Sequence, residues 1–88
     1  MFKNKNGDSN NISGKNIARV RKAAKPKLSQ RALADKLQLS GVDVDKNAIQ
    51  RIESGQRFVT DIELLAIAKV LNVSILDLVH LDTPEILS

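Results

Sequence analysis

Residues 28–55 read LSQRALADKLQLSGVDVDKNAIQRIESG, and this stretch decides the fold because it holds two short helical patterns separated by a polar connector. Ser29 can cap the first helix, whose apolar residues recur at helical spacing at Leu33, Ala34 and Leu37. The connector, QLSGVDV, follows Leu37 and contains a glycine. The stretch therefore predicts a pair of short helices joined by a turn.

The second helix of this pair is predicted to begin after Asp45, which is a good N-terminal cap, and to end before Gly55. Ile49 and Ile52 share one face, which we expect to point inward with Ala48 and Glu53. The residues left on the outward face are Lys46, Asn47, Gln50, Arg51 and Ser54. None of them is acidic or apolar, whereas an ordinary solvated face mixes both signs of charge.

Three further helices are predicted around this pair. The first follows Ser13, a plausible cap, and stops before Pro26; its stripe is Ile17, Val20, Arg21 and Ala24. The fourth starts at a capping box formed by Thr60 and Glu63 and ends at Asn72. Its apolar face consists of Leu64, Ile67, Ala68 and Leu71. The fifth is short; Ser74 and Asp77 can cap it, and its apolar residues are Ile75, Leu76 and Val79.

The length of 88 residues favours one small domain, and 42% hydrophobic residues with two aromatic ones favour an aliphatic, all-helical core. Residues 1–11 are rich in Asn and Lys and are expected to form a flexible polar tail. Lys3 and Lys5 leave open that this tail is a basic arm that contacts phosphates. Residues 12–80 are the predicted domain, and residues 81–88 are a second tail and a possible dimer contact.

Charge is distributed unevenly along the chain. Residues 1–57 contain 13 of the 14 Lys and Arg residues, whereas five of the ten acidic residues lie in 58–88. A basic face of this kind suits a polyanionic partner. The absence of cysteine, of a membrane-span-length apolar run and of a signal-peptide core leads us to expect a cytoplasmic protein.

The outward face of the helix at 45–54 has the chemistry of a DNA reader. Asn and Gln can bond adenine through two hydrogen bonds, and Lys and Arg can bond guanine, all in the major groove. This composition indicates sequence-specific binding to double-stranded DNA.

Several segments in this order, LSQRALADKL, AIQRIESGQR and ELLAIAKVLNVS, resemble the lambda-repressor and Cro-like helix-turn-helix regulators, also called XRE-type. The similarity extends from Ile17 to Val79. It implies a compact five-helix fold in which helices two and three form the helix-turn-helix, and it implies a small transcriptional regulator, expected to be a repressor.

The resemblance also implies roles for individual residues. Base edges would be read by Lys46, Asn47, Gln50 and Arg51. Phosphates would be contacted at the start of helix two and after helix three by Gln30, Arg31, Gln56 and Arg57. Related regulators pair across a two-fold axis, so a homodimer on a palindromic operator is expected, with the fifth helix and the apolar residues after it at the interface.

Two loops depart from the family pattern. The connector at 38–44 is longer than usual and has Gln38 where the family has a glycine, so it can alter how the reading helix is oriented. About two extra residues around Lys25, Pro26 and Lys27 lengthen the loop before Leu28 and are expected to matter little.

Arg21 and Glu53 both lie on inward-facing stripes, where an unpaired charge would be costly, so they are predicted to form a structural ion pair. A catalytic role for Glu53 is not supported, because no nucleophile or histidine accompanies it. His80, the single histidine, is interpreted as a helix-end residue rather than a metal ligand with Asp77 and Asp82. No enzyme activity, cofactor, metal or small-molecule effector is expected.

One function of another class stays open. An antitoxin or accessory module would act through a protein partner, gripped by the apolar fifth helix and by Ile86 and Leu87. Salt dependence of DNA affinity separates the two functions, because phosphate contacts give a steep dependence and an apolar protein interface does not.

Overall fold

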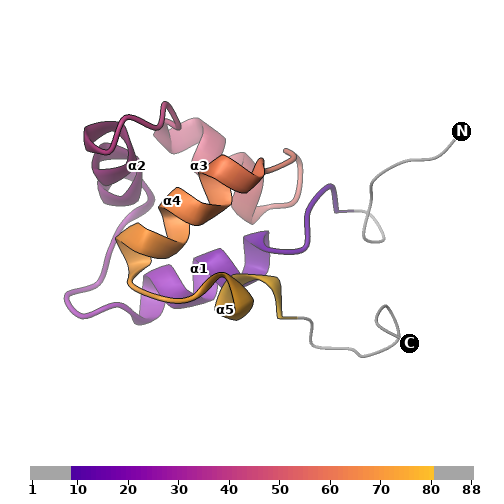
Figure 1. Ribbon diagram of the computed structural model, residues 1–88, viewed down its shortest axis with the longest axis horizontal. Coiled ribbons are helices and arrows are strands. Elements are labelled where there is room, and N and C mark those ends of the chain that lie inside the picture. The colour runs from indigo at the N-terminus through magenta and orange to yellow at the C-terminus, as the bar shows by residue number, and fades with distance from the viewer. Residues whose placement is uncertain (1–8, 81–88) are drawn as a thin grey trace, which may run out of the picture.

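The chain folds into an all-helical domain, as its sequence predicts. The computed structural model describes residues 9–80, in which the elements are α1 (Gly14–Ala23), α2 (Gln30–Leu39), α3 (Lys46–Glu53), α4 (Asp61–Leu71) and α5 (Ile75–Val79). In Figure 1, α4 lies across the front of the molecule with α5 below it. This arrangement confirms the predicted five-helix fold class.

Side-chain caps start four of the five helices at the predicted residues. Ser29 accepts a hydrogen bond of 3.0 Å from the Ala32 amide, and Asp45 accepts one of 2.8 Å from the Ala48 amide. Reciprocal capping boxes begin α4, from Thr60 and Glu63, and α5, from Ser74 and Asp77. Each cap satisfies amides that have no partner inside the helix, which fixes where the helix begins.

The first helix is capped differently from the prediction. Ser13 precedes α1 but its side chain makes no capping hydrogen bond. Instead, Oδ1 of Asn11 accepts a hydrogen bond of 2.7 Å from the amide of Gly14. The side chain of Asn11 therefore caps α1, the role that the sequence pattern assigned to Ser13.

The predicted tail boundary at residue 11 is wrong for residues 9–11. The amide of Asn10 donates a hydrogen bond of 2.8 Å to the carbonyl of Gly55, and Nδ2 of Asn10 donates one of 3.0 Å to the carbonyl of Gln56. These bonds hold the segment against the turn after α3. The acceptors lie about 45 positions away along the chain, so neighbouring residues in the sequence do not reveal them. Residues 1–8, with Lys3 and Lys5, lie outside the described residues.

The connector between α2 and α3 is ordered by backbone hydrogen bonds. Helix α2 extends to Leu39, and the Val42 amide then donates to the carbonyl of Leu37 over 2.9 Å. This chain reversal uses a left-handed residue, Gly41, whose φ is 84°. Val44 is 1% exposed and joins the core, so the additional connector residues pack as part of the domain.

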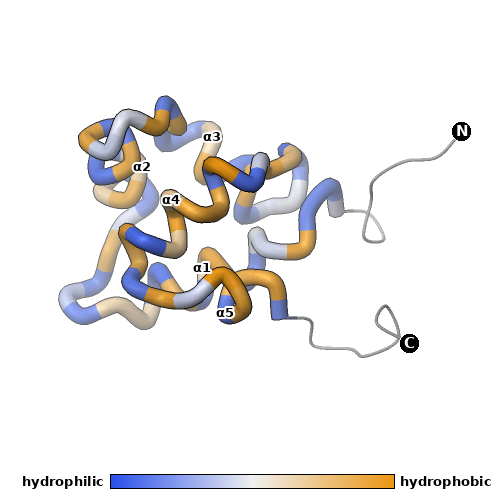
Figure 2. Tube along the Cα trace, in the orientation of Figure 1, coloured by the Kyte–Doolittle hydropathy of each residue, from blue (hydrophilic) through white to orange (hydrophobic). Residues whose placement is uncertain are grey.

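The core is aliphatic and draws on every helix. Residues with no exposed surface include Ile17, Leu33, Ile49, Ile67 and Leu78, one from each helix in order. Helix α4 is coloured hydrophobic along most of its length in Figure 2. In α5, Leu78 provides the core contact. Of the apolar residues that the sequence singled out there, Ile75 and Leu76 are exposed and Val79 is half-buried.

The C-terminal end of α3 packs closely against the start of α1. Gly14 lies against the carbonyl of Ile52 so closely that a Cβ atom at position 14 would overlap the carbonyl oxygen. Because α1 begins at this glycine, the end of α3 is fixed to the start of α1.

Candidate nucleic-acid interface

Helix α3 presents the predicted outward face to solvent. Lys46, Asn47, Gln50 and Arg51 are all exposed, whereas Ile49 and Ile52 are 0% exposed on the opposite side. Two apolar anchors at a spacing of one helical turn fix the rotation of this short helix about its own axis. The four exposed side chains therefore share one face.

A shallow hollow of about 340 Å³ runs along this face. Its lining residues are Asn47, Gln50, Arg51, Ser54 and Gln56. The structure thus brings together three of the four residues predicted to read bases and one of those predicted to contact phosphates. All five can donate or accept hydrogen bonds, which is the requirement for a surface that reads base edges.

Helix α2 packs beside α3. Arg31 and Lys46 line the same small hollow between the two helices, together with Asp35, Gln38 and Asp45. Gln30, half-buried at the N-terminus of α2, donates a hydrogen bond of 2.9 Å from Nε2 to Oε1 of Glu53. The side chain of Gln30 is therefore held by α3 in this structure, while Arg31 next to it is exposed.

Arg21 and Glu53 form the ion pair that their positions predicted. Nε of Arg21 lies 2.7 Å from Oε2 of Glu53 and Nη2 lies 2.9 Å from Oε1, and both side chains are 8% exposed. Nη1 of Arg21 also donates to the carbonyl of Leu28 over 3.0 Å. This guanidinium thus ties α1 to the end of α3 and to the loop before α2.

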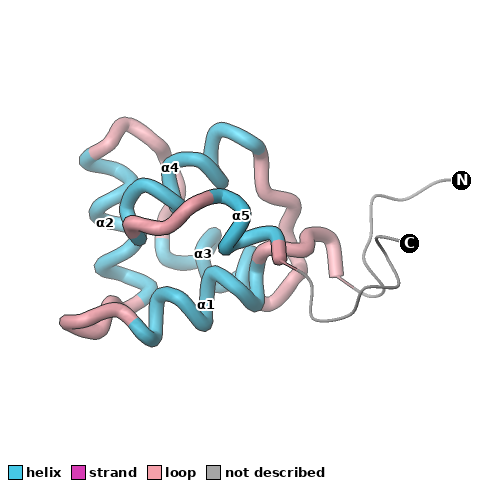
Figure 3. The backbone as a smooth tube through the Cα atoms, turned by 60° about the horizontal axis from the view of Figure 1, so that its bottom comes forward, coloured by secondary structure: helices cyan, strands magenta, loops and turns pink. Residues whose placement is uncertain are grey.

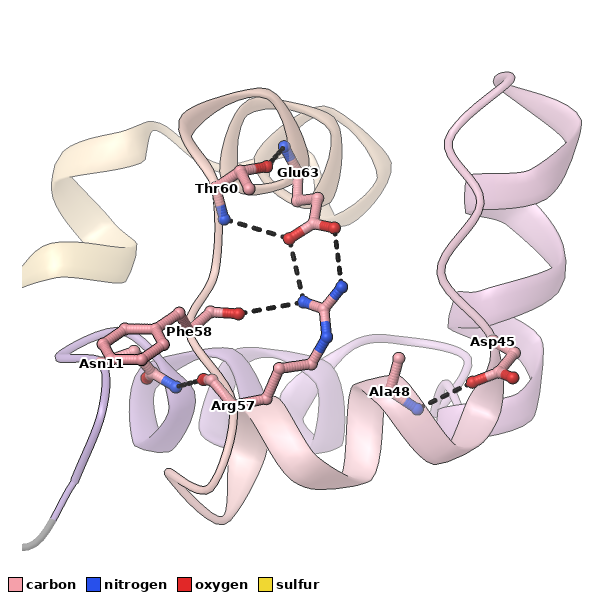
Figure 4. Close-up of polar contacts among 7 residues, drawn as sticks. All are labelled: Asn11, Asp45, Ala48, Arg57, Phe58, Thr60 and Glu63. Carbon is pink, nitrogen blue, oxygen red and sulfur yellow. Dashed lines mark hydrogen bonds and ion pairs between the residues drawn. The ribbon is translucent and has the colours of Figure 1, made fainter.

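Arg57, for which the resemblance implies a phosphate contact, is paired with an acidic residue in this structure. Its guanidinium forms a bidentate ion pair with Glu63, in which Nη1 lies 2.9 Å from Oε1 and Nη2 lies 2.9 Å from Oε2. Nη1 also donates a hydrogen bond to the carbonyl of Phe58 (Figure 4). The hydrogen bond and charge of Arg57 lower the pKa of Glu63, and Glu63 raises the pKa of Arg57. Gln56, by contrast, is exposed and faces the same hollow as α3.

Sequence reasoning missed Asn11 as a residue of this region. Its Nδ2 donates to the carbonyl of Ile52 over 3.0 Å and to the carbonyl of Arg57 over 2.7 Å, the second of which is drawn in Figure 4. These carbonyls belong to the end of α3 and the turn after it. Asn11 lies three residues before the first residue of α1, and its two long-range acceptors cannot be recognised from the local sequence.

Other kinds of site have little support in the part of the chain that the structure describes. Within residues 9–80, no three side chains of the types His, Asp and Glu gather where they could hold a metal ion. Asp82, considered with His80 as a ligand, lies outside that range. None of the described helices is long and apolar enough to cross a membrane.

Comparison with known families assigns the class. A family model for helix-turn-helix domains matches residues 17–78, which include all of α2, α3 and α4. The chain belongs to this helix-turn-helix family, of the lambda-repressor and Cro-like or XRE type. It is therefore a DNA-binding regulator of the helix-turn-helix class, a class that is regulatory rather than enzymatic. No curated protein and no solved structure was found to match the chain.

Proposed function

We propose that the protein is a sequence-specific transcriptional repressor that reads the major groove of duplex DNA with the outward face of α3. The observation that carries the proposal is the shared hollow on that face, lined by exposed Asn47, Gln50 and Arg51. These side chains can distinguish adenine and guanine from the other bases by paired hydrogen bonds. Lys46, exposed one residue before Asn47, adds a second cation that can bond guanine.

Phosphate contacts on either side of α3 complete the proposed interface. Arg31 is exposed at the start of α2, and Gln56 is exposed after α3. Gln30 is hydrogen-bonded to Glu53, and Arg57 is paired with Glu63. To contact a phosphate, each of these two side chains has to share or break its present bond. We therefore assign the stronger backbone contacts to Arg31 and Gln56.

Repression requires only that the protein occupy its site, so the DNA-binding domain is sufficient for it. We propose a palindromic operator bound by a homodimer, because one α3 of eight residues reads too few base pairs for useful specificity. The exposed apolar side chains of α5, with Leu76 77% exposed and Ile75 38% exposed, support a dimer contact at this helix. The cytoplasm is the proposed location, in keeping with a sequence that contains no cysteine.

The same apolar residues favour the second candidate function, an accessory or antitoxin module that binds a protein partner. The two functions differ in what salt does to binding. If about five phosphates are neutralised, the logarithm of the DNA affinity should fall with a slope of roughly −4 to −5 against the logarithm of the salt concentration.

The test is selection of bound sequences from a random duplex pool, followed by affinity measurements at several salt concentrations. A palindromic consensus, two proteins per duplex by mass, and the steep salt slope would support the proposal. Recovery of no preferred sequence, with affinity indifferent to salt, would remove it and favour the protein-partner function.

A further inference from the structure

Residues 9–11, which precede α1, lie against the turn that follows α3. The main-chain amide of Asn10 donates a hydrogen bond of 2.8 Å to the carbonyl of Gly55, and Nδ2 of Asn10 donates one of 3.0 Å to the carbonyl of Gln56. Figure 3 shows the two segments as neighbouring loops, at the opposite end of the molecule from the loop that joins α1 to α2. A segment that the sequence assigns to a polar tail is therefore in direct contact with the border of the proposed interface.

Gly55 makes this close approach possible. Its φ is 81°, a left-handed conformation that glycine adopts without strain. A Cβ atom at position 55 would overlap Oγ of Ser9, so the segment could not lie this close to a turn with a larger residue there. The glycine thus allows the backbone of Asn10 to come within hydrogen-bond distance of the turn.

Gln56 is held at both of its peptide groups. Its amide donates a hydrogen bond of 2.9 Å to the carbonyl of Arg51, in the last turn of α3, and its own carbonyl accepts the bond from Asn10. The first bond is local, whereas the second comes from a residue 46 positions away. The direction in which the Gln56 side chain leaves the backbone is therefore set jointly by α3 and by Asn10.

This direction decides what the Gln56 side chain can reach. Gln56 is exposed and lines the hollow of about 340 Å³ on the outward face of α3. Asn10 is half-buried and is not one of the residues that line this hollow. The bond from Asn10 to the Gln56 carbonyl therefore links the segment before α1 to the hollow.

A backbone that is fixed before binding lowers the cost of the contact. Ordering the backbone of a residue when it meets a ligand opposes association, because conformational freedom is lost at that moment. A residue whose two peptide groups are already bonded in the free protein loses little more. The same side chain on a loose turn would bind more weakly.

We propose that Asn10 is a positioning residue for DNA binding, which holds the backbone of Gln56 so that its side chain points where it can contact a DNA phosphate. The inference rests on the proposed function, in which Gln56 contacts the DNA backbone beside α3. It gives the segment before α1 a role in binding that is exerted through the turn after α3.

The test is a double-mutant cycle with Asn10→Ala, Gln56→Ala and the variant that carries both substitutions. Gln56→Ala removes the side chain that would meet the phosphate but keeps the carbonyl to which Asn10 is bonded. A purely structural effect of Asn10 therefore persists in the Gln56→Ala background, whereas an effect exerted through the Gln56 side chain disappears there. The control is Ser40→Ala, which removes another exposed side-chain hydrogen bond, one of 3.1 Å to the carbonyl of Lys36 in α2.

Affinity is measured on the preferred duplex and on a scrambled one at several salt concentrations. Asn10→Ala alone should weaken both duplexes by the same factor, about three- to tenfold, because a phosphate contact carries no sequence information. The salt slope should not change, since glutamine is neutral and releases no counterion. In the Gln56→Ala background, Asn10→Ala should weaken binding by no more than about twofold, the usual error of additivity.

Ser40→Ala should bind both duplexes as the unsubstituted protein does. Equal losses from Asn10→Ala in the two backgrounds, or a loss confined to the preferred duplex, would overturn the positioning role.

Hydrogen exchange of the Gln56 amide gives a second measurement, made without DNA. In Asn10→Ala this amide should exchange faster than in the unsubstituted protein, because the turn opens locally more often, while amides of the core keep their protection. Unchanged exchange at Gln56 would show that Asn10 does not hold the turn, and it would overturn the proposal even if the affinity falls.

The failure of this proposal and the failure of the proposed function can be told apart. The cycle can be measured on a scrambled duplex, so a protein that binds duplexes without sequence preference loses the repressor function and still tests Asn10. Binding to a preferred duplex with additive effects in the cycle keeps the repressor function and removes the positioning role. A protein that binds no duplex would remove both.

Discussion

Nε2 of Gln30 donates a hydrogen bond of 2.9 Å to Oε1 of Glu53, the same oxygen that accepts one from Nη2 of Arg21. The start of α2 and the end of α3 are therefore held by a single carboxylate, which α1 neutralises. Because the angle between α2 and α3 sets where both helices meet DNA, Glu53 links the stability of the domain to the geometry of the proposed interface.

Removing Glu53 should destabilise the fold strongly. In Glu53→Ala, Arg21 is left buried without a counter-charge, and the loss of one partner of a buried pair typically costs about 3–5 kcal/mol. For a domain of this size each kcal/mol lowers the melting temperature by about 4–8 °C. Thermal unfolding followed by circular dichroism measures the shift, with Asp35→Ala, an exposed carboxylate on α2, as the control. Equal melting temperatures for the two variants would contradict the structural role of the pair.

The pair between Arg57 and Glu63 should make stability depend on pH in the acid range. Because the folded-state pKa of Glu63 is lowered, chiefly by its hydrogen bond from Arg57, the pair stabilises the fold above the unfolded-state pKa of glutamate. That stabilisation is lost as the pH falls through the lowered pKa.

The measurement is urea unfolding of the unsubstituted protein and of Glu63→Gln between about pH 7 and about pH 3. Glu63→Gln should be the less stable protein at neutral pH, and the difference should shrink in acid. Asp61→Asn removes an exposed carboxylate from the same helix turn and controls for net charge. A difference that stays constant across this pH range would show that Glu63 does not titrate with its partner.

Asn11 should contribute more to stability than its neighbour Asn10. Its side chain makes hydrogen bonds to Ile52, Arg57 and Gly14, whereas that of Asn10 makes one exposed bond to Gln56. At about 1 kcal/mol for each net hydrogen bond, Asn11→Ala should lose about 2–3 kcal/mol and Asn10→Ala about 1 kcal/mol or less. Chemical denaturation of the two variants measures the difference, and equal losses would show that Asn11 does not clamp the end of α3.

Local patterns were sufficient to predict the helices. The caps at Ser29, Asp45, Thr60 and Ser74 each depend on residues within one helical turn, and all four are present. The Arg21 and Glu53 pair was also predictable, although the residues lie 32 positions apart, because burying either charge alone is costly.

Long-range contacts of polar residues were not predictable in this way. Asn11 reaches acceptors 41 and 46 positions away, and nothing in a polar stretch of Asn and Ser indicates such partners. The pair of Arg57 with Glu63 spans only six positions, but it depends on how the turn after α3 folds back toward α4.

Single substitutions in the proposed interface should distinguish residues that bond base edges from residues that contact phosphates. Asn47→Ala and Arg51→Ala each remove a side chain that lines the hollow on α3. Each should cost about 1–3 kcal/mol on the preferred duplex and leave nonspecific binding nearly unchanged, so discrimination between sites falls.

Arg31→Ala should do the opposite, because an exposed cation at the start of α2 grips phosphates of every sequence alike. It should weaken preferred and scrambled duplexes by a similar factor and reduce the salt slope by about 0.9. Gln30→Ala should also weaken both duplexes alike, but with a fall in melting temperature that Arg31→Ala lacks, because it removes a hydrogen bond from Glu53. Anisotropy titrations of the four variants on both duplexes make the comparison. Equal losses on the preferred and scrambled duplexes for Asn47→Ala and Arg51→Ala would mean that the bases are read by another surface, since a side chain that bonds a base edge has to lose more where that base is present.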